Sequence, residues 1–210
     1  MKPALSLEEL GRELRVSRET LDRFETYGAL LERWQERVNL VGPGTLADIW
    51  RTHFLDSGQL WPLAPKSAKK WLDLGSGAGF PGLVLAILGA PEVHLVESNQ
   101  KKAAFLREAA RITAATVIVH SERIENLPPF PVDVITARAL SRLDTLVQWA
   151  HPFAHAGTVA LFPKGQDVDV ELTETSKSWI IDIERHESRS DARGVILCVR
   201  GLVHARNHPA

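Results

Sequence analysis

The sequence KWLDLGSGAGFPGLVLAIL spans residues 70–88 and joins a predicted strand to a predicted helix. The strand is Lys70–Leu74, and the apolar run Pro81–Leu88 is predicted to form the helix. Three glycines lie in the turn between them, at positions 75, 77 and 79. A helix N-terminus offers unpaired N–H donors and the positive end of the helix dipole, and glycines in front of it let a ligand lie against the backbone. The stretch therefore predicts a ligand-binding turn in a fold that alternates strands and helices.

Short apolar runs alternate with helical patterns from residue 69 onward. Runs of this kind, separated by helices, are typical of a parallel sheet that is covered on both faces. The last two runs are joined by a polar loop without a helix and should pair antiparallel. We therefore expect an α/β fold with a seven-stranded sheet, mostly parallel and with an antiparallel C-terminal hairpin. The expected strands are Lys70–Leu74, Val93–Glu97, Thr116–His120, Val132–Ala137, Gly157–Phe162, Trp179–Glu184 and Val195–Val199, and the expected helices among them are Pro81–Leu88, Asn99–Ile112 and Leu143–His151.

The N-terminal part of the chain has helical patterns. A capping-box sequence at residues 6–9 precedes a first helix, and a second helix is predicted over residues 18–38. Thr45 and Asp48 are expected to cap a third helix, and the proline-containing segment at 61–65 is a plausible hinge. The predicted domains are a small helical extension, residues 1–60, and a main domain, residues 66–210.

The composition is that of a globular protein, with 44% hydrophobic and 24% charged residues among 210. The net charge of −1 gives no overall basic character of the kind seen in dedicated nucleic-acid binders, although a local patch can still bind RNA. The single cysteine, Cys198, excludes an internal disulfide and fits a reducing compartment. His151 and His155 are four residues apart but do not make a complete ligand set, so we expect no metal site. We expect a cytoplasmic protein without a membrane-spanning segment.

Phe80 and Glu97 narrow the ligand of the glycine turn. A dinucleotide fingerprint requires glycine or alanine where Phe80 stands, and no Gly-Lys-Ser/Thr follows the glycines as a P-loop would require. Glu97 ends the next predicted strand, where a carboxylate can accept hydrogen bonds from two ribose hydroxyls. The alternative is an ordinary exposed carboxylate at a strand end. The two features together favour a nucleoside ligand that is not a dinucleotide.

Two further segments follow strands that end at the same edge of the sheet. Residues 121–125 follow the third strand, and their backbone and Glu125 are placed to surround an adenine ring. Arg138 follows the fourth strand, and its positive charge suits an anionic substrate or a carboxylate of the bound nucleoside ligand. The alternative for Arg138 is a surface arginine at the start of a helix.

The glycine turn resembles the first motif of the class I methyltransferases, Asp-x-Gly-x-Gly-x-Gly, in which Asp73 is the first residue. Five stretches carry a more specific resemblance: Val38–Leu40, His53–Ser57, Asp73–Gly82, Ala137–Ala139 and Lys164–Gly165. In these stretches the sequence resembles the GidB (RsmG) family of bacterial small-subunit ribosomal RNA methyltransferases. Two positions depart from the usual family pattern: Thr52 replaces an arginine before the histidine of His-x-x-Asp-Ser, and Val38 replaces an aromatic residue.

The resemblance implies a Rossmann-like fold and a defined reaction. The methyl donor would be S-adenosylmethionine, leaving S-adenosylhomocysteine, and the acceptor the N7 atom of a guanine in small-subunit ribosomal RNA, within an assembled or partly assembled subunit. We also expect the protein to act as a monomer. The donor contacts implied by the resemblance or by the glycine motif are Asp73, Gly75, Gly77, Gly79, Phe80, Glu97, Ile124, Glu125 and Arg138.

The substrate side of the pocket is less defined by the sequence. Asn39, His53, Asp56 and Arg138 are candidates to line it, but the first three are equally natural as capping and packing residues of the helical extension. Because guanine N7 carries a free lone pair, we expect no general base. Three sets of cations are candidate phosphate contacts or simply solvated faces. They are Arg185, Arg189, Arg193, Arg200 and Arg206 near the C-terminus, Lys101, Lys102, Arg107 and Arg111 on one predicted helix, and Arg138, Arg142 and Lys164 near the edge of the sheet that carries the glycine turn.

Two other functions remain open from the sequence. One is methylation of a small molecule or a protein, and the other is nucleoside binding without catalysis. The motifs at residues 53–57 and 79–82 favour the RNA-modifying family over both.

Overall fold

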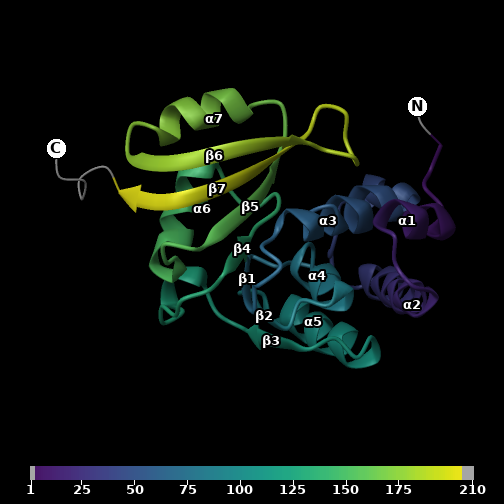
Figure 1. Ribbon diagram of the computed structural model, residues 1–210. Helices are drawn as coiled ribbons and strands as arrows, with labels where there is room; N and C mark the ends of the chain where they lie inside the picture. Colours follow the sequence, from purple (N-terminus) through teal and green to yellow (C-terminus); the bar gives the residue numbers. More distant parts are fainter. Residues whose placement is uncertain (1–2, 205–210) are drawn as a thin grey trace.

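The strands form a single seven-stranded sheet in the order β3-β2-β1-β4-β5-β7-β6 (Figure 1). A computed structural model describes residues 3–204. The first five strands pair in parallel, whereas β7 pairs antiparallel with both β5 and β6. This confirms the predicted sheet with its antiparallel C-terminal hairpin. The strands are β1 Lys70–Leu74, β2 Glu92–Val96, β3 Val117–His120, β4 Val134–Thr136, β5 Val159–Lys164, β6 Trp179–Glu187 and β7 Val195–His204.

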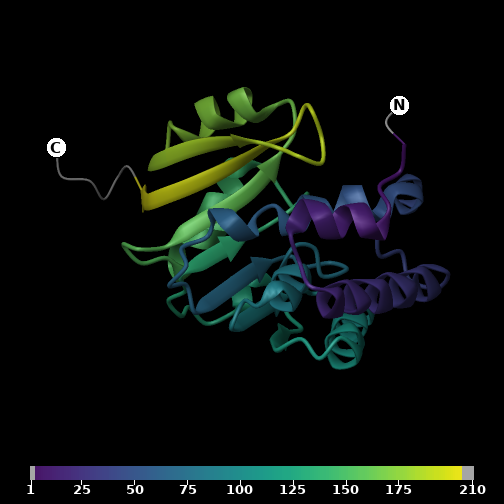
Figure 2. The same cartoon turned by 45° about the vertical axis from the view of Figure 1, so that its right-hand side comes forward.

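Helices cover both faces of this sheet (Figures 1 and 2). One face packs against α4 Gly82–Leu88 and α5 Gln100–Ile112, and outside these lie α1 Leu7–Leu14 and α2 Arg18–Gln35. The opposite face packs against α6 Leu143–Ala150 and α7 Val168–Thr175. No helix among residues 3–204 is long and apolar enough to cross a bilayer.

The N-terminal helical segment and the sheet share one apolar core. Tyr27 of α2 stacks on Phe80 of the glycine turn at 5.3 Å between ring centroids, and it meets Phe54 edge-on at 5.2 Å. At the predicted hinge, Trp61 stacks on Trp71 of β1 at 5.7 Å. The helical segment is therefore packed directly against the sheet domain and the glycine turn.

The helices of the structure differ from the predicted ones in three places, of which the first two are the end of α2 and the presence of α7. The second helix ends at Gln35 rather than at residue 38, because the Gln35 side chain accepts hydrogen bonds from the backbone N–H groups of Leu40 and Val41 and thereby stabilises a turn. The helix α7 was not predicted, since its polar and β-branched sequence VDVELTET has no clear apolar stripe.

The third predicted helix differs most. Residues Pro43–Asp48 form a 3₁₀ helix, Trp50–Leu55 a π-helical segment, and α3 covers only Asp56–Gly58. Thr45 and Asp48 cap none of these three segments. The Thr45 hydroxyl donates to the Gly42 carbonyl, and the Asp48 carboxylate binds the Leu5 N–H and Arg51. π-helical turns are rare and are frequently found at functional sites. The remaining short 3₁₀ helices are Trp61–Leu63, Ile124–Asn126 and His151–Phe153.

Candidate active site

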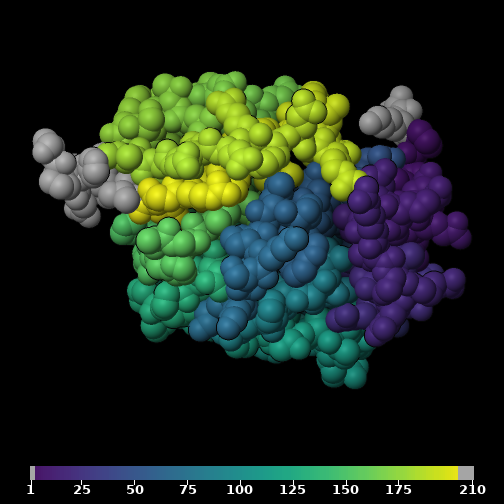
Figure 3. All heavy atoms as spheres, viewed as in Figure 1, coloured from purple at the N-terminus to yellow at the C-terminus, as the bar shows by residue number. Residues whose placement is uncertain are grey.

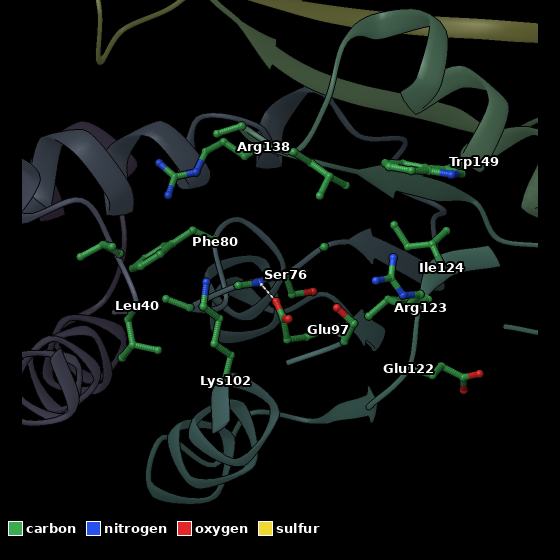
Figure 4. A pocket seen from close by; sticks show the side chains of 18 of the residues that line it. Leu40, Ser76, Phe80, Glu97, Lys102, Glu122, Arg123, Ile124, Arg138 and Trp149 are labelled. Carbon is green, nitrogen blue, oxygen red and sulfur yellow. Dashed lines mark hydrogen bonds between the residues drawn. The ribbon is translucent and has the colours of Figure 1, made fainter. Parts of the chain in front are cut away.

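A pocket of about 470 Å³ lies at the carboxyl ends of the central parallel strands (Figure 4). This edge is where open α/β sheets bind ligands, and the volume is within the usual range for small-molecule sites. Its floor is the glycine turn, and one wall comes from the residues that follow β2 and β3. The opposite wall is formed by Leu40–Gly42, His53 and Arg138, so the helical segment and the sheet both contribute to the pocket.

The glycine turn leaves its backbone open to the pocket at Gly77. Gly75 and Gly77 have positive φ values of 64° and 57°, which side chains of L-residues rarely adopt. A Cβ atom added to Gly77 would meet nothing closer than the Gly75 carbonyl oxygen at 3.9 Å, so this glycine faces open space. The turn therefore provides a surface against which a ligand can lie, as the sequence predicts.

Asp73 and Gly79 lie beneath the turn and do not line the pocket. The Asp73 carboxylate is buried and accepts hydrogen bonds from the Thr136 hydroxyl at 2.7 Å and from the Gly82 N–H at 3.2 Å. Burial raises the pKa of Asp73 to about 6, against the opposing effect of these hydrogen bonds. A Cβ atom on Gly79 would stand 2.6 Å from the Tyr27 hydroxyl oxygen. Both residues shape the turn from below, and a direct donor contact for either of them stays a prediction.

Glu97 stands at the end of β2 with its carboxylate beside the turn (Figure 4). One carboxylate oxygen accepts from the Gly77 N–H at 2.9 Å and the other from the Asn99 N–H at 2.7 Å. Glu97 is only 9% exposed, which argues against an ordinary surface carboxylate. Each carboxylate oxygen has a further lone pair that can accept from a hydroxyl. The position therefore suits the predicted ribose contact.

The far end of the pocket suits a flat ring. Ile124 and Glu125 line it as predicted, and Trp149 of α6 lies across from Ile124 (Figure 4). Trp149 was missed by the sequence analysis because α6 is an amphipathic helix, and nothing in its pattern separates a pocket-lining residue from a packing one. Leu140 was missed too, and its side chain occupies the space that a Cβ atom on Gly75 would need, at 2.4 Å.

Arg138 reaches from the end of β4 to the helical segment, where three groups bind its guanidinium. Its Nη1 donates to the Thr52 carbonyl at 2.8 Å and to Asp56 Oδ2 at 3.2 Å, and its Nη2 donates to His53 Nδ1 at 2.6 Å. The guanidinium also lies over the Phe80 ring, 5.3 Å from the centroid. Nε and the second hydrogen on Nη2 have no hydrogen-bond partner among the described residues. Arg138 is therefore held in place and keeps donors for a ligand.

These contacts define the protonation state of His53. An arginine only donates, so Nδ1 of His53 accepts and carries no hydrogen. The Thr45 hydroxyl donates to the Gly42 carbonyl at 2.7 Å and is left to accept from His53 Nε2, also at 2.7 Å. Burial, followed by the charge of Arg138, lowers the pKa of His53 to about 3. His53 is therefore a neutral imidazole with hydrogen on Nε2.

The other residues predicted for the substrate side lie outside the pocket lining. Asn39 is exposed and accepts from Gln35 at 3.4 Å, one residue before Leu40 enters the wall. Asp56 lies behind Arg138 and contacts the pocket only through it. Thr52 binds Arg138 through its backbone carbonyl, so this contact does not depend on which side chain stands there. Direct substrate contacts for Asn39 and Asp56 stay predictions.

Most of the predicted phosphate contacts are already paired with carboxylates. Lys102 lines the pocket, and the half-buried Lys164 amine pairs with Glu171 at 2.6 Å. Arg206 lies outside the described residues, and the RNA-binding role of the others stays a prediction. The pairs are Arg185–Asp169, Arg189–Glu13, Arg193–Asp191, Arg200–Glu184 and Arg111–Glu108.

Potential metal ligands come together elsewhere in the fold. Glu184, His186 and Cys198 have ligand atoms within 4.8 Å of one another on β6 and β7, in the part of the chain that the structure describes. Glu184 is already engaged there by Arg200 at 3.4 Å and by His186 at 3.2 Å. His155 pairs with Asp133 at 3.5 Å, away from this group. The expectation of no metal site stays a prediction.

The strand order, the open glycine turn and the buried acid at the end of β2 define an S-adenosylmethionine-dependent methyltransferase of class I. Solved structures share the fold. A ribosomal protein L11 methylase from Lactobacillus delbrueckii subsp. bulgaricus has a TM-score of 0.54 at 18% identity, over 68% of this chain and 77% of that one. A Pyrococcus abyssi tRNA (uracil-54, C5)-methyltransferase in complex with S-adenosyl-L-homocysteine has a TM-score of 0.51 at 16% identity, over 68% of this chain and 36% of that one.

The family is shown by closer relatives. The GidB family model, described as rRNA small subunit methyltransferase G, matches residues 20–195. The ribosomal RNA small subunit methyltransferase G of Rhodospirillum rubrum is 56% identical over 197 residues, covering 94% of this chain and 98% of the relative. That of Paramagnetospirillum magneticum is 51% identical over 202 residues, covering 96% and 98%. The chain belongs to the GidB family, as its motifs predict.

Proposed function

We propose that this protein transfers a methyl group from S-adenosylmethionine to N7 of a guanine in small-subunit ribosomal RNA. The observation that carries the proposal is the pocket itself, in which the glycine turn and Glu97 face a wall built from the family's His-x-x-Asp-Ser segment and Arg138. Family membership and the names of the relatives support the RNA acceptor. The choice of N7 rests on the family resemblance.

The residues of the pocket fit the methyl donor. Glu97 presents lone pairs to ribose hydroxyls, Ile124 offers an apolar wall to adenine, and Gly77 leaves room for the amino-acid end. The unpaired N–H groups of Arg138 are suited to the donor's carboxylate. When bound, the donor supplies an electrophilic methyl group on a sulfonium. The protein's contribution is then to hold the donor and to orient its methyl group toward the acceptor.

The titratable groups around the pocket support a reaction without a general base. Both nitrogens of His53 are engaged, and its pKa of about 3 leaves it a weak base. Asp56 is committed to Arg138, and Asp73 is buried beneath the glycine turn. Guanine N7 needs no deprotonation before it attacks. Catalysis would come from alignment of donor and acceptor and from exclusion of water.

The surface charge supports a folded subunit as the substrate rather than bare RNA. The net charge is −1, and the C-terminal arginines at positions 185, 189, 193 and 200 are paired with carboxylates. Salt-dependent binding to bare RNA grows with the number of cations free to neutralise phosphates. We propose that a cytoplasmic monomer recognises ribosomal RNA presented within an assembled or partly assembled small subunit.

A transfer assay tests this function. The protein and methyl-labelled donor are incubated in three separate reactions, which contain small ribosomal subunits, deproteinised small-subunit RNA or ribosomal proteins. We expect label in RNA from intact subunits, at a single guanine whose N7 modification is mapped by chemical cleavage. Label in protein or in a small molecule would overturn the RNA acceptor, and donor binding without transfer would leave only a nucleoside-binding module.

Glu97→Ala is the matched variant for the donor site. Loss of an acceptor for two backbone N–H groups and for ribose should weaken donor binding by roughly 1–3 kcal/mol in calorimetry. Glu174→Gln removes a carboxylate paired only with Lys177 on the surface and should leave donor affinity unchanged. Equal affinity in both variants would return Glu97 to a structural role.

A further inference from the structure

The turn between β6 and β7 is joined to Arg138 by a chain of hydrogen bonds. We propose that Ser190 in this turn is a positioning residue for the pocket, acting through Asp56 on the guanidinium of Arg138. Ser190 is distant from Asp56 by 134 residues in sequence, and neither lines the pocket. The proposal rests on the proposed function only in taking the pocket as the methyl-donor site.

The carboxylate of Asp56 divides its two oxygens between the turn and the pocket. Oδ2 accepts from Arg138 Nη1 at 3.2 Å, whereas Oδ1 accepts from the Ser190 hydroxyl at 2.5 Å and from Gln59 Nε2 at 3.2 Å. The carboxylate is thus held from behind by neutral donors while it faces the arginine. Fixing the carboxylate plane in this way also fixes the direction in which it attracts the guanidinium.

The turn is itself fastened to the helical segment. The buried Gln59 side chain accepts from the Arg189 N–H at 2.7 Å and donates to the hydroxyls of Ser188 and Ser190 at 3.2 and 3.3 Å. The two serine hydroxyls also contact each other at 2.9 Å, and Arg189 pairs with Glu13 of α1. The end of the hairpin lies against the N-terminal helices in Figures 2 and 3. These hydrogen bonds therefore connect three parts of the chain: the end of β4, the His-x-x-Asp-Ser segment and the C-terminal hairpin.

Arg138 gains a specific orientation from these contacts. It extends away from its own strand, and every hydrogen bond that its guanidinium makes with the described residues goes to residues 52–56. Two of its N–H groups keep no partner among the described residues, so the same contacts that hold the guanidinium decide where these donors point. A carboxylate that is free to rotate would hold the guanidinium less firmly, and ligand affinity would fall without loss of the charge.

Donor binding in a double-mutant cycle tests the coupling. We expect Ser190→Ala to lower donor affinity in calorimetry about 3- to 10-fold. This corresponds to part of the free energy of one hydrogen bond to a charged group, because Ser190 acts on the donor only through Asp56 and Arg138. In an Arg138→Lys background, where the forked guanidinium is absent, Ser190→Ala should have no further effect. Ser190→Thr keeps the hydroxyl and should restore affinity. Ser176→Ala, an exposed serine that binds only the Thr173 carbonyl, is the control and should change nothing.

A second measurement needs no ligand. The ¹⁵N resonance of His53 Nδ1 reports the hydrogen bond from Arg138, so Ser190→Ala should shift it and Ser176→Ala should not. A lowered melting temperature with unchanged donor affinity and an unchanged His53 resonance would overturn the proposal, as would additive effects in the cycle. If Arg138→Lys itself leaves donor affinity unchanged, the His53 resonance alone decides. Neither measurement uses RNA, so a failed methyl transfer to ribosomal RNA leaves both outcomes readable.

Discussion

At the residue scale, Gly77 and Gly79 stand two positions apart in one turn and serve different purposes. Gly77 faces open space in the pocket, whereas Gly79 is packed against Tyr27 and the Leu83 side chain. Both have positive φ, so any side chain costs about 1–2 kcal/mol at either position. The difference between them lies in what a side chain would touch.

Substitution of these glycines should separate binding from stability. Gly77→Arg places a large side chain where the donor would lie, so calorimetry should show no donor binding while circular dichroism shows a folded protein. Gly79→Ala forces a Cβ atom to within 2.6 Å of the Tyr27 hydroxyl and 2.9 Å of Leu83 Cβ, so it should lower the free energy of unfolding by more than about 2 kcal/mol. Gly44→Arg, at a position with nothing within 4 Å, is the control for both. Normal donor affinity in Gly77→Arg would contradict the proposed site.

The neutral state of His53 predicts a dependence of stability on pH. The folded-state pKa is about 3 and the ordinary value is 6.5, so between these values the unfolded chain binds a proton that the folded chain does not. The free energy of unfolding therefore rises with pH across this window, and the contribution is fully present only above about pH 6.5. Protonation of Nδ1 would also remove the acceptor that Arg138 uses.

His53→Asn isolates this contribution, because the amide oxygen can accept from Arg138 and does not titrate here. Urea unfolding of both proteins from about pH 4.5 to about pH 7.5 should show the difference in free energy, wild type minus variant, rising with pH by at most about 1.4 kcal/mol per pH unit up to about pH 6.5. Above that pH the difference should be flat. A difference that is constant over the whole range would mean that the folded-state pKa of His53 is not lowered.

At the element scale, Arg23 of α2 binds the ends of two helices of the sheet domain, in addition to the packing of Tyr27 on Phe80. The Arg23 guanidinium donates to the carbonyls of Thr113 and Ala114, just after α5, at 2.7 and 3.3 Å, and to the Ile87 carbonyl in the last turn of α4 at 3.2 Å. Carbonyls at helix C-termini lack intrahelical partners and carry partial negative charge, so a cation there satisfies both needs.

Arg23→Gln should therefore lower the free energy of unfolding by about 1.5–3 kcal/mol, measured by urea denaturation. Arg18→Gln, one turn earlier on the same helix, is the control, because its side chain is 91% exposed and pairs only with Asp22. The control should unfold like the wild-type protein. Equal stability of both variants would mean that the Arg23 hydrogen bonds add nothing measurable to the stability of the fold.

At the scale of the whole molecule, the helical segment and the sheet domain should unfold as one unit. Phe54 and Tyr27 are fully buried against Phe80 of the glycine turn, so removal of residues 1–60 would expose this apolar surface. We expect a fragment of residues 66–210 to bind a hydrophobic dye and to aggregate, and the full chain to show one transition by both fluorescence and circular dichroism. A soluble, donor-binding fragment would show two independent domains.

The sequence alone was sufficient for the parts of this protein that depend on local pattern. Alternating apolar runs and helical periods predicted the sheet and its antiparallel end, because backbone hydrogen bonding and burial impose those periods on neighbouring residues. Glycine spacing and Glu97 predict a ligand site at this edge of the sheet, because such a turn needs small residues at fixed positions, and the structure shows a pocket there. The sequence does not predict α7, whose pattern has no clear apolar stripe, and it places the end of α2 three residues too late, because the Gln35 side chain turns the chain there.

Only the tertiary structure decided which residues bind Arg138 and which line the pocket. The sequence places His53, Asp56 and Arg138 in stretches that resemble the family's motifs but does not show that His53 and Asp56 both bind the arginine. The sequence also does not show that Ser190 binds Asp56 or that Trp149 lines the pocket wall. These contacts join segments far apart in the chain, and their geometry follows from packing the helical segment and the hairpin against one sheet. The glycine turn is thus encoded in one short stretch of sequence, whereas the contacts that hold Arg138 exist only in the folded molecule.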